Sequence, residues 1–256
     1  MTDGVGSPEL SEADVPRGVA AIFGPTLNAV LAPTQAFEVL GRHPLLAGWP
    51  IFWMIVVMML LGAVNLDITR QIMRVGVVEG MAGQGQQVDA EQVRTIIDTM
   101  DKWAPAWAVG FNLFALLSVV VLAGLIWIGA STMGGVTKFS HSFAVASIGA
   151  VIHPLLATAF VTLVWRLEPP EIRRVADFVR SMPSLGLGLF TGDIELSPAM
   201  AQVVARVDVF NFWWMAVIVI GCERLLGLKR GAAMAMAIAL WVLSTGLMAF
   251  WASLGS

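Results

Sequence analysis

The chain has little charge for its length. Asp, Glu, Lys and Arg supply 13% of its 256 residues, whereas hydrophobic residues supply 57%. An ordinary soluble domain carries about 25% charged residues, so the composition excludes that class. Several apolar runs near 20 residues explain the shortage, because about that many helical residues cross a ~30 Å hydrocarbon core. The sequence therefore predicts an all-α, polytopic membrane protein.

Cysteine is nearly absent, and no excess of positive charge is present. Cys222 is the only cysteine, which excludes an intrachain disulfide and a zinc site built from several cysteines. Its place within an apolar run favours a buried, inert thiol. The formal net charge of −3 provides no basic footprint for nucleic acid. We expect no nucleic-acid partner.

Motifs of catalysis and metal binding are also missing. His43, His141 and His153 are scattered along the chain, and neither His-Glu-x-x-His nor Cys-x-x-Cys occurs. The Gly-rich stretch "GMAGQGQQ" is not followed by Gly-Lys-Ser/Thr, so a flexible turn is a better interpretation than a phosphate loop. No Ser lies in a nucleophile elbow. We therefore predict a protein without catalytic residues, metal or cofactor.

The beginning of the chain is acidic and rich in Gly and Pro, "MTDGVGSPELSEADVPRG". It lacks the basic start and apolar core of a signal peptide. Residues 1–21 are expected to be a disordered tail, and the first apolar run is expected to stay in the protein as a span.

Residues 22–44 are too broken by proline to cross a membrane. After Pro33, which suits the first turn of a helix, Phe37 and Leu40 can share one helical face. We predict a short amphipathic helix at the membrane interface. An exposed helix with one apolar stripe is the alternative.

Residues 22–256 are predicted to form a single membrane domain with five spans. Trp residues gather near the proposed ends, as in the aromatic belts of membrane proteins. The predicted spans are residues 45–65, 107–131, 143–165, 208–228 and 232–254.

Two long connectors alternate with two short ones. In the long connectors, residues 66–106 and 166–207, apolar side chains recur at helical spacing, which predicts amphipathic helices on one membrane face. The recurring residues are Val93, Ile96, Ile97 and Met100 in the first, and Ile172, Val175, Ala176 and Val179 in the second.

Charge does not fix the orientation of the chain. Nine of the 15 Lys and Arg residues fall on the side of the long connectors and six on the side of the tail and short connectors. The raw count favours long connectors in the cytoplasm. The short connectors are denser in positive charge, which favours the opposite orientation, with the short connectors in the cytoplasm. Composition alone leaves both orientations open.

Polar residues within the spans are the candidate functional residues. Asp208 and Asn211 begin the fourth span and Glu223 lies near its end, all within about 120° on the helix. About 22 Å of rise separates Asp208 from Glu223, so interfacial anchors are one interpretation. The alternative is a polar path through the bundle, with partners drawn from the other spans. The possible partners are His153, Asn112 and Asn65.

Three stretches together resemble the Yip-domain family of five-span proteins, the Ypt/Rab-interacting proteins of eukaryotes, which has bacterial members too. The first is "LAPTQAFEVLGRHPLLAGWP", with Pro and Phe-Glu before the first span. The second is "MGGVTKFSHSFAVASIGAVIHPLL", with Gly-Gly, Lys-Phe and a small-residue span. The third is "VARVDVFNFWWMAVIVIGCERLLGLKRGAAMAMAIALWVL". Their order and spacing over residues 31–245 carry the resemblance.

The resemblance implies a five-helix bundle with a cytoplasmic amino terminus. It also implies that Asp208, Phe210, Trp213 and Trp214 form the family's signature at the start of the fourth span. Eukaryotic members recruit prenylated small GTPases, and some bacterial relatives are associated with export or envelope-stress systems. The Ala-, Gly- and Val-rich composition is similar to that of bacterial members, which implies an inner-membrane location.

Two functions remain as predictions. The first is a non-enzymatic scaffold or accessory subunit in the lipid bilayer, bound to a membrane-protein partner or to further copies of itself. The second is a transporter or channel for a small solute or ion, in which Asp208, Asn211, His153 and Asn112 line one water-accessible path.

Overall fold

The computed structural model describes residues 19–85, 89–135, 138–174, 183, 185–191 and 196–254. Most of the predicted tail lies outside these residues, and residues 19–21 belong to the first helix. The elements in chain order are α1 Val19–Leu31, α2 Pro33–Arg42, the 3-10 helix η2 Pro44–Ala47, α3 Gly48–Val64, α4 Leu66–Gly83, α5 Ala90–Thr132, α6 Phe139–Leu167, α8 Gly188–Thr191, α9 Pro198–Ala205, α10 Val209–Leu226 and α11 Arg230–Leu254.

Five segments of the described residues are helical, long and apolar enough to cross a membrane. They lie over the five apolar runs of the sequence. This confirms the predicted all-α class with five membrane helices. The segments are Pro44–Val64, Leu113–Thr132, Phe139–Leu167, Val209–Leu226 and Arg230–Leu254.

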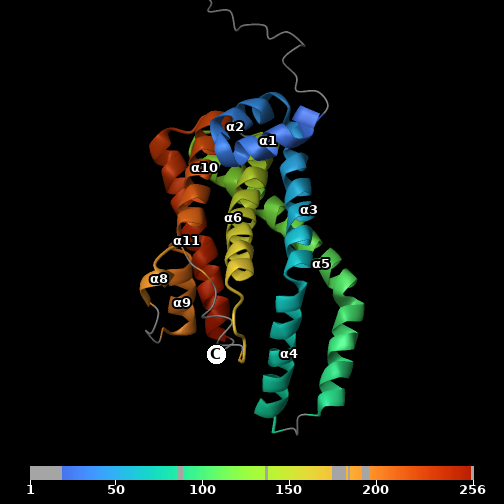
Figure 1. The fold of residues 1–256 in the computed structure, drawn as a ribbon. Helices are drawn as coiled ribbons and strands as arrows, with labels where there is room; N and C mark the ends of the chain where they lie inside the picture. Colours follow the sequence, from blue (N-terminus) through green and yellow to red (C-terminus); the bar gives the residue numbers. More distant parts are fainter. Residues whose placement is uncertain are drawn as a thin grey trace, which may run out of the picture.

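Helix α6 is the centre of the bundle. It lies between α3 on one side and α10 on the other, and α5 crosses behind it (Figure 1). Within its most apolar window 44% of the residues are buried, against 22% in the window of α5, so α5 leaves far more of its surface for lipid. The largest fully buried side chains include Ile148 and Ile152 of α6 and Ile218 of α10.

Glycine allows α6 and α10 to approach closely. A Cβ atom added to Gly149 of α6 would lie 2.6 Å from Cδ1 of Ile218, and one added to Gly221 of α10 would lie 2.9 Å from Cγ1 of Val145. Small residues permit this close backbone contact in membrane bundles, where van der Waals packing drives association. The "ASIGA" stretch of the sequence therefore forms part of the bundle's central contact.

Helices α1 and α2 lie across one end of the bundle, together with the short connectors (Figure 1). Phe37 and Leu40 share the inner face of α2, as the sequence predicted, and both are fully buried. The ring of Phe37 lies over Gly221, where an added Cβ would be 2.7 Å from its Cζ atom. The inner face of α2 thus packs on α6 and α10 and closes this end.

The short connector between α10 and α11 depends on a left-handed glycine. Gly227 has φ +65°, and the N–H of Leu228 donates to the carbonyl of Cys222 over 3.2 Å. Glycine adopts positive φ without the cost that a Cβ brings, and such a cap satisfies carbonyls that the helix end would leave free. The chain can therefore reverse within three residues.

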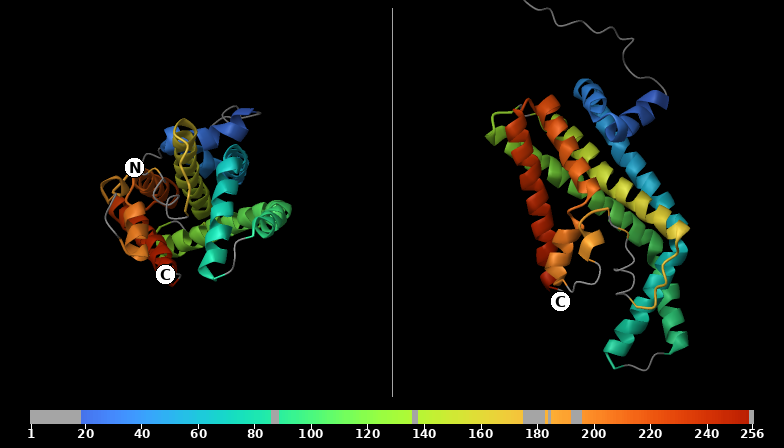
Figure 2. Two further views of the ribbon diagram at one scale, coloured as in Figure 1. Left: turned by 60° about the horizontal axis from the view of Figure 1, so that its bottom comes forward. Right: turned by 60° about the vertical axis from the view of Figure 1, so that its left-hand side comes forward.

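At the other end, α4 and α5 form an antiparallel hairpin that continues beyond α3 (Figure 1). Helix α5 has 43 residues, or about 65 Å of rise, roughly twice the hydrocarbon thickness. The hairpin reaches past the end of α11 in the right-hand view of Figure 2. The predicted helix through Val93 and Met100 is thus the first part of α5 and is continuous with the second span.

The sequence analysis did not predict α4, although Ile68, Ile72 and Val75 recur along it at helical spacing. Ile68 packs with Trp165 and Ile172 in a small second apolar cluster, which joins α4 to the end of α6 and the chain after it. The helix predicted in the second long connector falls mostly on residues 175–182, outside the described residues.

Candidate functional site

Asp208 directly precedes α10 and caps the amino terminus of that helix. Its backbone is extended, with φ −133° and ψ +167°, and its Oδ1 accepts a hydrogen bond from the backbone N–H of Asn211 over 2.6 Å. A carboxylate at this position satisfies a free N–H and faces the positive end of the helix dipole. The sequence places Asp208 here because the apolar run begins directly after it.

Asn211 connects Asp208 to His153 of α6. Its Nδ2 lies 3.1 Å from Oδ2 of Asp208 and 3.0 Å from Nε2 of His153. Asn211 is buried, with 3% of its surface exposed. A side-chain amide has two N–H donors, so one can go to the carboxylate and the other to the ring nitrogen.

His153 and Asp208 are close but not in direct hydrogen-bond contact. Nε2 of His153 is 3.8 Å from Oδ2 of Asp208, beyond ordinary hydrogen-bond distance, and the amide of Asn211 bridges the two groups. Three of the six predicted polar residues therefore meet in one cluster, which joins α6 to the start of α10. Sequence reasoning foresaw that His153 could partner this end of α10, and the structure supplies the contact.

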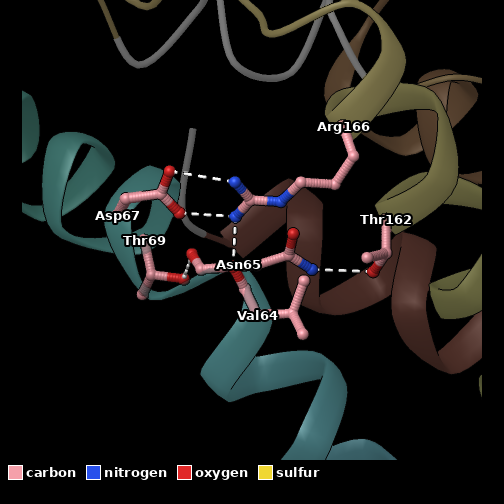
Figure 3. A network of polar contacts seen from close by, with 6 residues as sticks. All are labelled: Val64, Asn65, Asp67, Thr69, Thr162 and Arg166. Atoms are coloured by element: carbon pink, nitrogen blue, oxygen red, sulfur yellow. Dashed lines mark hydrogen bonds and ion pairs between the residues drawn. The ribbon is translucent and has the colours of Figure 1, made fainter.

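Asn65 belongs to a second network, at the junction of α3 and α4 (Figure 3). Its Nδ2 donates to Oγ1 of Thr162 over 2.7 Å, and both residues are buried. Oγ1 of Thr69 donates to the carbonyl of Asn65 over 3.0 Å. These bonds fix the point where the first span ends and α4 begins. A polar residue at the end of an apolar run is a recognisable signal, but its partner lies 97 residues away.

Arg166, at the end of α6, binds residues of the same junction between α3 and α4 (Figure 3). Its guanidinium makes a two-pronged contact with Asp67, with N–O distances of 3.1 and 2.5 Å, and also donates to the carbonyl of Val64. The hydrogen bonds from Arg166 hold the pKa of Asp67 at about 2, below its usual value. Because the folded pKa is lowered, the pair contributes fully above about pH 4 and is lost as the pH falls toward 2. Sequence analysis missed this pair.

Glu223 lies apart from the other candidates. It is half-buried near the end of α10, and it lines an open groove of about 430 Å³ between α10 and α11. Arg230 lines the same groove, whereas His153 and Asp208 do not. The polar face that the sequence suggested for α10 therefore divides into two separate sites at its two ends.

The aromatic residues after Asp208 pack around the start of α10. The ring of Phe210 lies 5.8 Å from that of Phe160 on α6, and Trp213 and Trp214 pack against the central apolar core. The backbone of Asn112 is part of α5, and its side chain lies outside the described part of the structure. The role of these residues as a signature stays a prediction.

The described contacts of His153, Asn211 and Asp208 are hydrogen bonds among these residues. Among the described residues, no group of three or more His, Cys, Asp or Glu side chains could hold a metal ion. The only cysteine, Cys222, is fully buried in the core. The geometry of the cluster lets the amide of Asn211 hold His153 of α6 and Asp208 at the start of α10 together through hydrogen bonds.

The sequence matches the Yip1 domain over residues 27–252, which is most of the chain. The chain belongs to the Yip1-domain family. The match contains all three stretches on which the resemblance was based, so that prediction is confirmed. No curated protein and no solved structure gives a match. Family and helices together establish a multi-pass membrane protein of the Yip1 type.

Proposed function

We propose that this Yip1-domain protein is a non-enzymatic scaffold or accessory subunit that binds a membrane-protein partner through the α4–α5 hairpin. One observation carries the proposal. The hairpin extends beyond the membrane helices and keeps apolar side chains exposed there, with Ile96 38% and Met100 42% exposed. Exposed apolar surface outside the lipid is typical of interaction sites.

The hairpin exposes these residues on one face of α5. Val93 and Ile97 turn toward α4, and Val93 is 5% exposed. Ile96 and Met100 lie four residues apart and therefore form a neighbouring stripe. This stripe has the spacing with which a helix commonly docks against a partner helix. The partner is a component of an export or trafficking system, or a second copy of the chain.

The family resemblance supports a cytoplasmic amino terminus and a bacterial inner membrane. In that orientation the hairpin stands on the side of the membrane opposite the cytoplasm. A partner there would be the membrane domain or an external domain of such a system, because a cytoplasmic ATPase subunit could not reach it.

The test is purification of the tagged chain from its native membrane in nanodiscs, with identification and quantification of the proteins that co-purify. The variant I96S/M100S removes the apolar stripe, and L189S/F190S removes exposed apolar side chains of α8 outside the hairpin. We expect one stoichiometric partner with the native chain and with L189S/F190S. Interface anchors contribute about 2 kcal/mol or more, so I96S/M100S should reduce recovery at least ~30-fold.

Two outcomes would contradict the proposal. The native chain could be recovered alone and monomeric by mass photometry, or I96S/M100S could retain the partner. Far-UV circular dichroism and size-exclusion profiles of both variants must match those of the native chain, so that a lost partner does not reflect misfolding.

The transporter hypothesis is the second candidate, and the His153–Asn211–Asp208 cluster is the observation that favours it. Ionisable groups inside membrane bundles commonly belong to solute or proton paths. Against it, the three side chains bond to one another and Glu223 opens on a separate groove. Solute or proton flux into liposomes that contain the native chain, lost in D208N, would favour this candidate over the scaffold.

A further inference from the structure

The groove between α10 and α11 has apolar walls and two charged side chains, and the proposed function does not use it. Its volume is about 430 Å³, within the range of 300–1,000 Å³ that ligand sites commonly have. Glu223 of α10 and Arg230 of α11 are the charged residues of its described lining. The other described lining residues are all apolar, among them Ala216, Val219, Met234 and Ile238.

The charged residues lie at the edge of the membrane spans, and the apolar ones lie deeper. Helix α10 ends at Leu226 and α11 begins at Arg230, so the connector between them marks the edge of both spans. Glu223 is about 4.5 Å along α10 from Leu226, whereas Ala216 is about 15 Å from it. On α11, Ile238 is about 12 Å from Arg230. The groove therefore has its charges beside the headgroup layer and its apolar floor within the hydrocarbon core.

Neither charged residue is neutralised within the described part of the chain. There, neither the carboxylate of Glu223 nor the guanidinium of Arg230 has an ion-pair or hydrogen-bond partner. Arg224, the neighbour of Glu223, is paired instead with Glu38 of α2 over 4.0 Å. Charged groups that are partly removed from water are costly without a partner. A ligand that suits this groove therefore carries both an anion for Arg230 and a cation for Glu223.

Phosphatidylethanolamine carries both groups in one headgroup, above acyl chains that suit the apolar floor. A guanidinium group forms two parallel hydrogen bonds with phosphate oxygens. A primary ammonium group has three N–H donors for a carboxylate, whereas the trimethylammonium group of phosphatidylcholine has none. A purely anionic headgroup would pair with Arg230 and leave Glu223 without a cation. The charges of the groove thus favour a zwitterionic lipid with a primary ammonium group.

We propose that the α10–α11 groove binds one phosphatidylethanolamine molecule from the leaflet at the α1–α2 end of the bundle. Arg230 binds the phosphate, Glu223 accepts hydrogen bonds from the ammonium group, and one acyl chain lies along the floor over Ala216. This inference does not depend on the proposed partner, because the apolar stripe of Ile96 and Met100 lies on the hairpin, at the other end of the bundle (Figure 1).

The test is native mass spectrometry of the full chain in mild detergent, titrated with phosphatidylethanolamine and phosphatidylcholine that have identical acyl chains. A hydrogen bond to a charged group contributes about a 10-fold gain in affinity. We therefore expect the native chain to prefer phosphatidylethanolamine ~10-fold, and E223Q to lose this preference. R230Q should weaken both lipids ~5-fold, because both carry the phosphate. The control E38Q/R224Q removes one charge of each sign at the same end of the bundle, outside the groove, and should bind as the native chain does.

A second pair of variants tests whether the acyl chain lies in the groove. A216F fills the floor, and A239F adds the same ring to an exposed position of α11 that does not line the groove. We expect A216F to abolish saturable binding of the first lipid and A239F to leave it unchanged. Far-UV circular dichroism and size-exclusion profiles of both variants must match those of the native chain.

Three results would overturn the proposal. Equal affinity of the native chain for the two lipids would show that Glu223 does not recognise the ammonium group. Unchanged lipid binding by A216F would show that the lipid lies elsewhere. A native dimer that A216F, but not A239F, converts to a monomer would show that a second copy of the chain occupies the groove. In contrast, loss of lipid preference in E223Q but not in E38Q/R224Q would support the site, whatever the outcome of the partner experiment.

Discussion

The two ends of the bundle use amphipathic helices in opposite ways. At the end formed by α1 and α2, Phe37 and Leu40 are fully buried against α6 and α10. At the hairpin end, Ile96 and Met100 of α5 keep 38% and 42% of their surface exposed. Both helices have apolar residues at helical spacing. The difference shows that an apolar stripe on a helix is buried only where other helices of the bundle pack against it.

The two stripes differ in burial because the two helices lie at different positions relative to the membrane spans. Helix α2 lies across the bundle, so its inner face meets the ends of two central spans (Figure 1). The hairpin continues past the spans, where Ile96 and Met100 stay exposed and Ile68 of α4 packs in the small cluster with Trp165 and Ile172. Regions with few buried apolar contacts open at lower free energy. We expect the α2 end to determine global stability and the hairpin to be the adaptable part.

The largest predicted effect is that of Phe37→Ala. Removal of a fully buried Phe costs about 3–5 kcal/mol, because the transfer free energy is lost and a cavity is left. Met100→Ala on the hairpin should change stability by about 0.5 kcal/mol or less, as surface substitutions usually do. Thermal and denaturant unfolding of both variants in the same detergent would measure the difference. Equal effects of the two substitutions would show that the two ends do not differ in packing.

A glycine beneath α2 offers a second comparison. Gly221→Val would place its Cβ within 2.7–2.9 Å of Phe37 and Val145, and such overpacking costs about 1–3 kcal/mol. The matched substitution Gly62→Val is on α3, where an added Cβ meets nothing within 4 Å. It should be nearly neutral. Unfolding of the two variants side by side gives the result, and an unaffected Gly221→Val would contradict the close contact of α2 with α10.

The smallest predicted effect concerns the polar contact between α6 and α10. A double-mutant cycle with His153→Ala and Asn211→Ala should give a coupling energy of about 0.6 kcal/mol, the average for interhelical hydrogen bonds in a membrane bundle. The cycle of His153→Ala with Asn65→Ala is the control, and it should give none, since Asn65 bonds to Thr162. Coupling of equal size in both cycles would mean that the measured term is not the hydrogen bond.

Several features of the fold could be predicted from local sequence. The apolar runs predicted five membrane helices, and the spacing of Phe37 and Leu40 predicted the buried face of α2. Asp208 before an apolar run indicated the start of α10. These predictions depend on composition and on the 3.6-residue period, which any helix must obey regardless of its neighbours.

Other features could not be predicted, because they depend on contacts between segments that are far apart in the sequence. The sequence indicated a helix through Val93, but not that it continues without a break into the second span, since the stretch from Trp103 to Trp107 contains Pro105. The Asp67–Arg166 pair was missed because charges at the ends of two spans carry no signal of which span lies beside which. Local pattern describes one helix at a time.

By itself the sequence determined the helical class, the number of membrane helices and the family, because hydrophobicity and period act along one segment. The tertiary structure alone decided which polar groups meet. Asn211 contacts His153, 58 positions away in the sequence. Glu223, on the same helix, instead lines the groove between α10 and α11. These contacts depend on the rotation and depth at which α6 and α10 pack. Gly149 and Gly221 set that packing, since each places backbone where a Cβ would not fit.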